Sequence, residues 1–408
     1  MADSSPSAPL RWPRILAVIL AAFLLVEAGA QAFFLAWSGK PFNSIFLYQW
    51  SPYGLVRNNP DLTGNFEISR DGFRDTRTYT RDKPPKTLRL ILLGGSVLYS
   101  GVTPINAIRG FVPSDQTISQ YLAKRLQQDP AFAGVNVEVM NAGINFNTIR
   151  ETSASYLADY IHWDPDMVVV FGSANNFPGF QPMGALQARS LTLQAPHLWH
   201  GDFDRLVNER SLPSAIEGLF RQTADASATL AIVHKGLTRV LLENDPGRFL
   251  PMPRTGSPAW VRPGRAPREE EEQYFKLYAS YASAIIGAAR QSDQDVAFFW
   301  EYRLGDLEGI KPISPEERTI FPAVKRDPGD FAYDLRMRER WSTFLGGQNV
   351  IAVDPLAALK QAPQTVYTDY LHYTAEGNAF MADVTYAQLR ERLLQRLRAR
   401  ELAGPVPQ

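Results

Sequence analysis

The chain has 408 residues, which is enough for one large domain with insertions or for two smaller domains. Its 42 basic and 42 acidic residues give no net charge, and no long basic run occurs, so the composition argues against a nucleic-acid surface. The chain contains no cysteine, which excludes disulfides and a thiol nucleophile. Any nucleophile must therefore be an oxygen or a nitrogen.

The first pattern along the chain is an apolar stretch, residues 15–37, which is long enough to cross about 30 Å of hydrocarbon as a helix. Arg11 and Arg14 precede it, so the positive-inside rule places residues 1–14 in the cytoplasm and exports the remainder. A cleaved signal peptide is the alternative, with Ala28-Gly-Ala30 as the cleavage site. We favour an uncleaved transmembrane anchor, because apolar residues resume beyond that site.

The next segment, residues 38–86, is rich in Pro, Asn, Asp and Arg, which predicts an irregular spacer packed on the domain that follows. Within it, a strand from Phe66 and a tight turn at Asp71-Gly72 are expected. Pro84-Pro85 then ends the approach to the first core strand, which begins near Thr87.

Strand-like and helix-like patterns alternate through the rest of the chain. After the strand at Thr87, further strands are predicted over 135–141, 166–171, 295–301 and 349–354. Helices are predicted over 117–128, 148–161, 273–290 and 331–344, with a closing helix that runs to about Leu394. This alternation predicts parallel β-α-β units and an α/β fold whose five-stranded parallel sheet is covered on both faces.

A long interval, residues 177–272, interrupts this alternation. It is too long for a structureless loop, so we expect it to carry a helix across 214–242 and to form a lid or subdomain over one end of the sheet. Its His197 and His200 have a spacing that a metal site can use, but no carboxylate cluster adjoins them. We therefore expect no metal site there.

Ser96 stands at the end of the first core strand, after Gly94 and Gly95. The apolar run from Leu88 to Leu93 is typical of a strand buried on both faces, and the glycines allow a sharp turn with backbone amides open to an oxyanion. The alternative interpretation is a serine that only caps the next helix.

A second pattern lies near the other end of the chain, where Asp369 precedes His372 by three residues on a turn ahead of the closing helix. At that spacing an aspartate can reach the imidazole Nδ1 and hold the other ring nitrogen toward a nucleophile. Thr374 is a suitable N-cap for the helix, and Glu376 suits its positive end. Combined with Ser96, these residues predict a catalytic triad.

In a parallel α/β sheet the loops at the carboxyl ends of the strands lie together. The loops after three predicted strands therefore converge, and they contain Ser96, Gly143 and Asn175. The backbone amides of Ser96 and Gly143 and the side-chain amide of Asn175 are candidate oxyanion-hole donors. His372 would take the serine proton, and Asp369 would orient the imidazole.

These segments resemble, in order, the sequence blocks of the SGNH (GDSL-type) hydrolases, and the segment around Asp71-Gly72-Phe73-Arg74 is similar to the lead-in of membrane-anchored bacterial members. The matching blocks are Gly94-Gly95-Ser96, Asn141-Ala142-Gly143, Gly172-Ser173-Ala174-Asn175-Asn176 and Asp369-Tyr-Leu-His372. The resemblance implies a three-layer α/β/α flavodoxin-like sandwich over 87–398, a Ser96, His372 and Asp369 triad, and no cofactor. Gly95 stands where the family name has Asp, Ser173 where glycine is usual, and Asn176 where aspartate is usual.

The resemblance implies a membrane-anchored serine esterase or acyltransferase that acts on O-acyl, and specifically O-acetyl, esters of envelope glycans or lipids. Together with the N-terminal pattern, it predicts a single-pass protein of the bacterial inner membrane with a periplasmic catalytic domain. The alternative is a catalytically silent SGNH-fold glycan-binding or scaffold protein of a polysaccharide assembly complex. Glu27 within the apolar stretch would then contact a membrane-protein partner, although placement near the interface or protonation explains it equally well. The intact Ser96, Asp369 and His372 favour the enzyme.

Overall fold

The computed structural model divides the chain into two compact units, which are described separately. One comprises Met1–Ile45 and Asp202–Phe249, and the other comprises Phe46–Gly201 and Leu250–Gln408. The structure describes residues 12–38, 48–51, 55–58, 60, 67–75, 77–100, 112–145, 147–173, 227, 229, 268–324 and 328–403.

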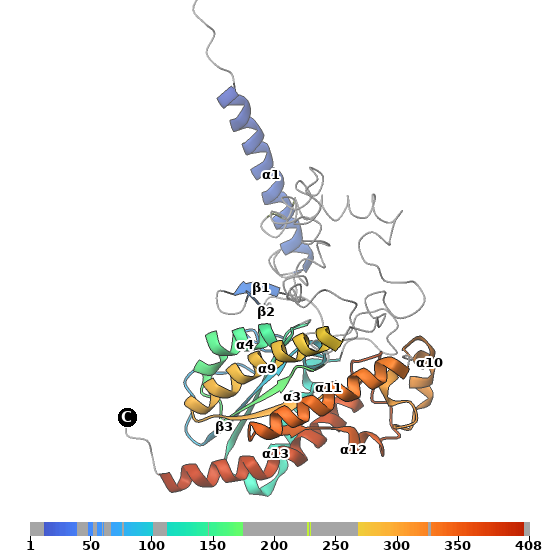
Figure 1. Ribbon diagram of the computed structural model, residues 1–408. Coiled ribbons are helices and arrows are strands. Elements are labelled where there is room, and N and C mark those ends of the chain that lie inside the picture. The colour runs from blue at the N-terminus through green and yellow to red at the C-terminus, as the bar shows by residue number, and fades with distance from the viewer. Residues whose placement is uncertain are drawn as a thin grey trace, which may run out of the picture. The chain divides into compact units, whose positions relative to one another are not determined.

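The first unit contains helix α1, Trp12–Ser38 (Figure 1). Its stretch Trp12–Phe33 is long and apolar enough to cross a membrane, and its apolar side chains are exposed instead of being packed in a core. Leu25, for example, is 74% exposed. Such a surface is costly in water and suits a helix surrounded by lipid. The helix expected over 214–242 lies outside the described residues, apart from Ser227 and Thr229.

The second unit contains a five-stranded sheet in the order β4-β3-β5-β6-β7, and all the strand pairs are parallel. The strands are β3 (Thr87–Gly94), β4 (Asn136–Gly143), β5 (Met167–Phe171), β6 (Asp295–Phe299) and β7 (Ile351–Val353). This is the order of a flavodoxin-like, doubly wound sheet, whose functional loops gather at the carboxyl ends of the strands where the winding reverses. The reversal occurs between β3 and β5, and β3 ends at Gly94, two residues before Ser96.

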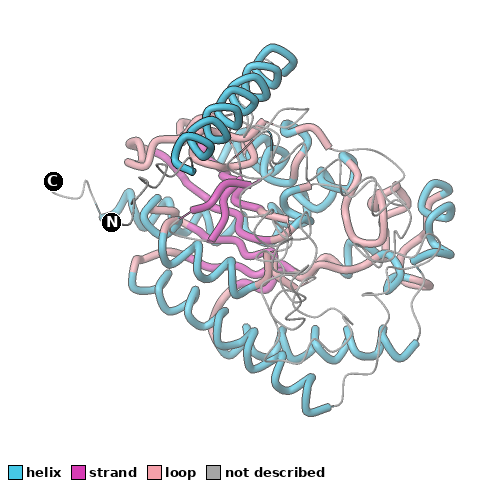
Figure 2. The backbone as a smooth tube through the Cα atoms, turned by 90° about the horizontal axis from the view of Figure 1, so that it is seen from above, coloured by secondary structure: helices cyan, strands magenta, loops and turns pink. Residues whose placement is uncertain are grey.

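Helices cover both faces of the sheet, so the second unit has three layers (Figures 1 and 2). Helices α3 (Ile118–Gln128) and α13 (Ala375–Ala403) pack together on one face. Helices α4 (Ile149–Ala158) and α9 (Arg268–Gln291) pack together on the other, where α11 (Pro328–Gly347) joins α9 through a hydrogen bond from Trp341 to Tyr278. The shorter helices are α2 (Ser96–Tyr99), α10 (Pro315–Val324) and α12 (Leu356–Leu359), with 3₁₀ turns at Ser114–Gln116, Pro130–Phe132, Tyr160–Trp163 and Leu304–Leu307.

The predicted α/β fold and five-stranded parallel sheet are confirmed, and the main differences are at the ends of elements. Helix α9 begins five residues before the predicted 273, and α13 extends beyond the predicted 394 to Ala403. Helix α10 was not predicted. Its sequence contains Pro322, in the last turn. Because a proline inside a helical pattern ordinarily indicates the end of a helix, the sequence did not indicate a helix here.

The spacer before the sheet contains more regular structure than expected. Strands β1 (Tyr48–Ser51) and β2 (Leu55–Asn58) form a separate antiparallel pair. The turn at Asp71-Gly72 is present, with Gly72 at φ +87, but residues 67–69 before it do not form a strand. A left-handed backbone of this kind favours glycine, which explains Gly72 at this position.

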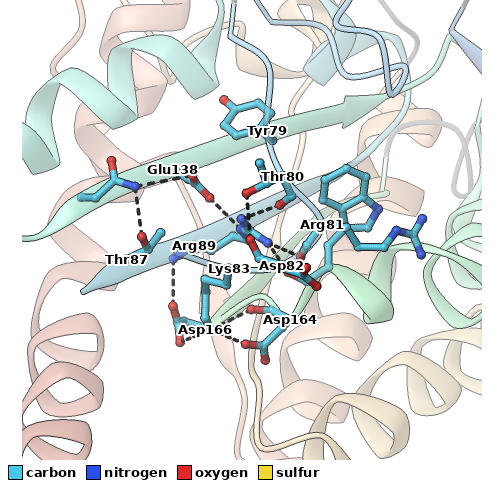
Figure 3. A network of polar contacts seen from close by, with 12 residues as sticks. Tyr79, Thr80, Arg81, Asp82, Lys83, Thr87, Arg89, Glu138, Asp164 and Asp166 are labelled. Atoms are coloured by element: carbon cyan, nitrogen blue, oxygen red, sulfur yellow. Dashed lines mark hydrogen bonds and ion pairs between the residues drawn. The ribbon is translucent and has the colours of Figure 1, made fainter. Parts of the chain in front are cut away.

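The end of the spacer is fixed to the amino-terminal end of the sheet by the buried Arg89 of β3 (Figure 3). Its guanidinium forms an ion pair with Glu138 of β4 at 2.7 Å and donates to the carbonyls of Thr80 and Trp163 at 2.8 and 2.6 Å. Asp166 accepts from the Arg89 backbone N–H at 2.8 Å. Because a buried charge needs this many partners, the network fixes the spacer firmly at the end of the sheet opposite Ser96.

Candidate active site

Ser96 begins the short helix α2, directly after the turn at the carboxyl end of β3. A Cβ at Gly94 would lie 2.3 Å from the Phe171 carbonyl oxygen, so only glycine lets β3 approach β5 this closely at the end of the strand. The Ser96 side chain is mostly buried, with the residue 9% exposed. Among the described residues, none accepts a hydrogen bond from the Ser96 backbone N–H.

The structure brings Ser96, His372 and Asp369 together in a continuous chain of contacts, although 276 positions separate Ser96 from His372 in the sequence. Ser96 Oγ lies 2.8 Å from His372 Nε2, and His372 Nδ1 lies 2.7 Å from Asp369 Oδ2. The second oxygen, Asp369 Oδ1, accepts the backbone N–H groups of Leu371 and His372 at 2.8 and 2.7 Å. The carboxylate is therefore fixed on both sides and orients the imidazole toward the serine.

The electrostatics of the pair favour an ionised carboxylate and a basic imidazole. Burial alone would raise the pKa of Asp369, but the facing His372 and the backbone hydrogen bonds outweigh it, so the pKa lies below its ordinary value. Burial alone would lower the pKa of His372, but Asp369 and, more weakly, Glu301 raise it above its ordinary value. The imidazole is thus a stronger proton acceptor than a free histidine.

The loop that carries Asp369 and His372 is held in place from outside. The carboxylate of Glu317 accepts the backbone N–H groups of Val366 and Tyr367 at 2.9 and 3.0 Å, and Lys311 neutralises Glu317 at 2.6 Å. On the far side of the loop, Thr374 Oγ1 accepts from the Gly377 N–H at 2.9 Å, which confirms the expected N-cap of α13. The loop that carries His372 is therefore fixed by hydrogen bonds on both sides, to Glu317 before it and through Thr374 after it.

Gly143 lies beside the nucleophile turn, but its backbone N–H is already engaged. It donates to Asn141 Oδ1 at 2.9 Å, and the same side chain donates through Nδ2 to the Leu98 carbonyl at 2.9 Å. Asn141 thus joins the end of β4 to α2. An oxyanion-hole role for the Gly143 amide would require this internal hydrogen bond to be exchanged for one to the substrate.

Asn175, the third predicted donor, lies outside the described residues, as do His197 and His200.

Two supporting residues, Arg74 and Asn58, were given no role at the site by the sequence, although Arg74 lies in the segment that resembles the family's lead-in. The guanidinium of Arg74 donates to the carbonyl of Tyr99 at 2.7 Å, to that of Val112 at 2.6 Å and to Ser114 Oγ at 2.7 Å. Burial lowers its pKa to about 10, so it remains charged at neutral pH. Asn58 donates to the Gly143 carbonyl at 2.9 Å. The spacer thereby stabilises both segments that flank the nucleophile.

Ser173 and Glu301 support the site from the ends of β5 and β6. The backbone N–H of Ser173 donates to Glu301 Oε2 at 3.0 Å, and the backbone N–H of Glu301 donates to Ser173 Oγ at 2.7 Å. A glycine at position 173 would lack the hydroxyl that completes this exchange. The segment after Glu301 also reaches the histidine loop, where the Leu304 N–H donates to the Tyr370 carbonyl at 2.9 Å. Sequence patterns alone give no signal for Glu301, because a single acidic residue at a strand end is common.

The described residues contain no group of three or more histidine, aspartate or glutamate side chains that could hold a metal ion. Independently of this, the residues described above place a nucleophilic hydroxyl, a candidate general base and a carboxylate that orients it within hydrogen-bonding distance of one another.

Comparison with known proteins gives only distant structural similarity. No protein-family model and no curated protein matches the chain. An acetylxylan esterase from Geobacillus stearothermophilus is similar at 13% identity and TM-score 0.36, over 76% of this chain and 96% of that one. A Desulfitobacterium hafniense protein assigned to the G-D-S-L lipolytic family is similar at 10% identity and TM-score 0.34, over 74% and 99%. An α/β hydrolase from the Lake Arreo metagenome is similar at 14% identity and TM-score 0.36, over 76% of this chain and 97% of that one. Values this low carry no argument about activity, so the functional conclusion depends on the residues of this chain.

Proposed function

We propose that this chain is a membrane-anchored serine esterase or acyltransferase of the SGNH (GDSL-type) hydrolase family, working through a covalent acyl-enzyme. The observation that carries the proposal is the hydrogen-bonded series from Asp369 through His372 to Ser96, with distances of 2.7 and 2.8 Å. Nucleophile, base and orienting group within hydrogen-bond reach are the geometric signature of nucleophilic acyl transfer.

In the first half of the reaction, His372 Nε2 takes the proton from Ser96 Oγ as that oxygen attacks the ester carbonyl. Asp369 holds the Nδ1 proton and stabilises the imidazolium that forms. The Ser96 backbone N–H, and by sequence position the Asn175 amide, would donate to the oxyanion. When the tetrahedral intermediate collapses, the bond to the alcohol oxygen breaks and His372 gives the proton to that leaving oxygen.

In the second half, water or a hydroxyl of an acceptor loses its proton to His372 and attacks the acyl carbon. The acid or the new ester then leaves, and Ser96 regains its proton. Water gives an esterase and a sugar hydroxyl gives an acyltransferase. We propose O-acetyl esters of envelope glycans or lipids as substrates, on the family resemblance of the four sequence blocks.

The proposed location is the extracytoplasmic face of the bacterial inner membrane. Helix α1 supports an anchor by its length and composition, and Arg11 and Arg14 at its amino-terminal side support a cytoplasmic N-terminus. The catalytic unit follows α1 in the chain and would therefore lie in the periplasm.

The test is covalent labelling of the full-length protein with a fluorophosphonate, followed by mapping of the adduct. We expect modification of Ser96 and loss of labelling in Ser96→Ala and His372→Ala, with each variant folded by circular dichroism. Ser100→Ala, which removes another buried hydroxyl near the same helix, should still label. Absence of labelling in the folded parent protein would overturn the enzymatic assignment and favour a silent binding protein.

A further inference from the structure

Helix α1 is not uniformly apolar, because Glu27 lies within the stretch that is long enough to span a membrane. Its carboxylate is fully engaged within the chain. Oε1 accepts from Gln31 Nε2 at 2.8 Å, whereas Oε2 accepts from Ser227 Oγ at 2.6 Å and from the Thr229 backbone N–H at 3.0 Å. All four residues belong to the same compact unit.

The partly buried residues of α1 lie on the side of the helix that carries Glu27. Glu27, Ala30 and Gln31 are partly buried, whereas every other residue of α1 whose exposure the structure describes is exposed. Spacings of three and four residues place these positions on one face, which we call the Glu27 stripe. The stripe is therefore the side of the anchor that another segment covers, and Ser227 and Thr229 belong to that segment.

The position of Glu27 implies that this contact lies at membrane depth. Glu27 precedes Phe33, the last residue of the candidate span, by six residues, which corresponds to about 9 Å along a helix. A carboxylate inside hydrocarbon is costly unless it is hydrogen-bonded. The hydroxyl of Ser227 and the N–H of Thr229 supply donors that water cannot supply there.

The sequence around Ser227 suits the same surroundings. Residues 226–233 read ASATLAIV and contain no charged side chain, and they are bounded by Asp225 on one side and by His234 and Lys235 on the other. Eight residues are too few to span a bilayer, for which about 20 are needed in a helix.

We propose that the part of the chain that carries Ser227 and Thr229 is a second membrane-contacting segment, which docks on the Glu27 stripe of α1 through the Glu27 carboxylate. The partner of the intramembrane acid is thus the chain's own insertion. The proposal also requires α1 to remain in the mature protein, since cleavage after Ala30 would remove Glu27. It is independent of the catalytic assignment.

The first test uses crosslinking in the full-length protein in native membranes. The chain has no cysteine, so introduced thiols are the only ones present. Ala30→Cys lies on the Glu27 stripe, and the control Gly29→Cys lies one residue away on a face where a Cβ meets nothing within 4 Å. Each is combined with Thr229→Cys, which keeps both the Thr229 backbone N–H and the Ser227 hydroxyl that contact Glu27, and is treated with a short thiol crosslinker. We expect a several-fold higher intramolecular yield for the pair with Ala30→Cys. Equal yields, or a mature chain whose intact mass lacks α1, would overturn the docking.

The second test separates the role of the carboxylate from simple proximity. Glu27→Gln keeps an acceptor oxygen and should leave the crosslink yield of the Ala30→Cys and Thr229→Cys pair unchanged. Glu27→Leu suits lipid equally well but accepts no hydrogen bond, so we expect its yield to fall several-fold. An unchanged yield in Glu27→Leu would overturn Glu27 as the docking group.

The third test asks whether the element touches lipid. A bimane label on Ala231→Cys, in full-length protein in nanodiscs, should be quenched by nitroxide-bearing lipids. A label on Leu20→Cys of α1, where the native residue is 57% exposed, should be quenched in the same way. Quenching of the label at 231 only by a water-soluble quencher, while the label at 20 responds to lipid, would overturn the membrane contact.

Discussion

Ser173 and Glu301 hydrogen-bond each other in both directions, so that the ends of β5 and β6 are joined near His372. The Ser173 N–H donates to Glu301 Oε2 at 3.0 Å, and the Glu301 N–H donates to Ser173 Oγ at 2.7 Å. Glu301 also contributes, after Asp369, to the raised pKa of His372. The pair therefore links the geometry of the site with its electrostatics.

Replacing Glu301 by Gln should shift the pH dependence of the proposed esterase. The carboxylate favours the protonated imidazole, so its loss lowers the pKa of His372. Because neutral His372 is the proposed general base, activity rises as pH rises through this pKa. The acid limb of the plot of kcat/KM against pH should therefore move to lower pH by a fraction of a unit. The measurement is kcat/KM for an aryl acetate against pH.

The matched control is Ser173→Ala, which removes the hydroxyl of the same pair but keeps the Glu301 charge. Its kcat/KM should fall without movement of the acid limb. If the two variants shift the limb equally, the effect belongs to loop geometry and the electrostatic role of Glu301 is wrong.

Asp369→Asn should reduce kcat about 10³- to 10⁴-fold, as expected when an amide replaces the carboxylate that sets the tautomer of a catalytic histidine. Its side-chain oxygen can still accept the Leu371 and His372 N–H groups, so the loop should retain its position. Single-turnover acylation by an aryl acetate measures the effect. A variant with nearly parental acylation would remove Asp369 from the triad.

Arg74→Lys should destabilise the fold near the nucleophile, although it keeps the charge. The guanidinium reaches Tyr99, Val112 and Ser114 with three different nitrogens, and a single ammonium cannot reproduce this fork. We expect the free energy of unfolding in urea to fall by about 2 kcal/mol or more. Arg70→Lys, at an exposed position in the neighbouring turn, should change it little. Equal losses would mean that the fork geometry is unimportant.

The sequence was sufficient to predict the core of the second unit because its signals are local. The apolar run before Gly94 and the alternation of strands and helices depend on neighbouring residues, and the strand β3 and the sheet order agree with them. The proximity of Ser96 to Asp369 and His372 could be predicted only because parallel strands bring their carboxyl ends together. The structure places these side chains at hydrogen-bonding distances.

The features that the sequence did not reveal are those in which a polar residue finds a distant partner. Nothing near Arg74 indicates that it supports α2, and nothing near Asn141 indicates that its side chain occupies the Gly143 amide. The antiparallel pair β1 and β2 was also missed, since its strands have only four residues each. Short strands and single buried polar residues carry little periodic signal, because tertiary contacts decide them.

Arg89→Met tests whether the network at the amino-terminal end of the sheet is structural only. The substitution leaves Glu138 buried without its cation, and loss of one partner of a buried pair costs about 3–5 kcal/mol. We therefore expect a large fall in the free energy of unfolding, while kcat per folded molecule is unchanged because Ser96 lies at the opposite end of β3. The control is Arg125→Met, whose ion pair with Asp383 has side chains that are 52% and 46% exposed and should contribute little. A reduced kcat in folded Arg89→Met would show that the two ends of the sheet are coupled.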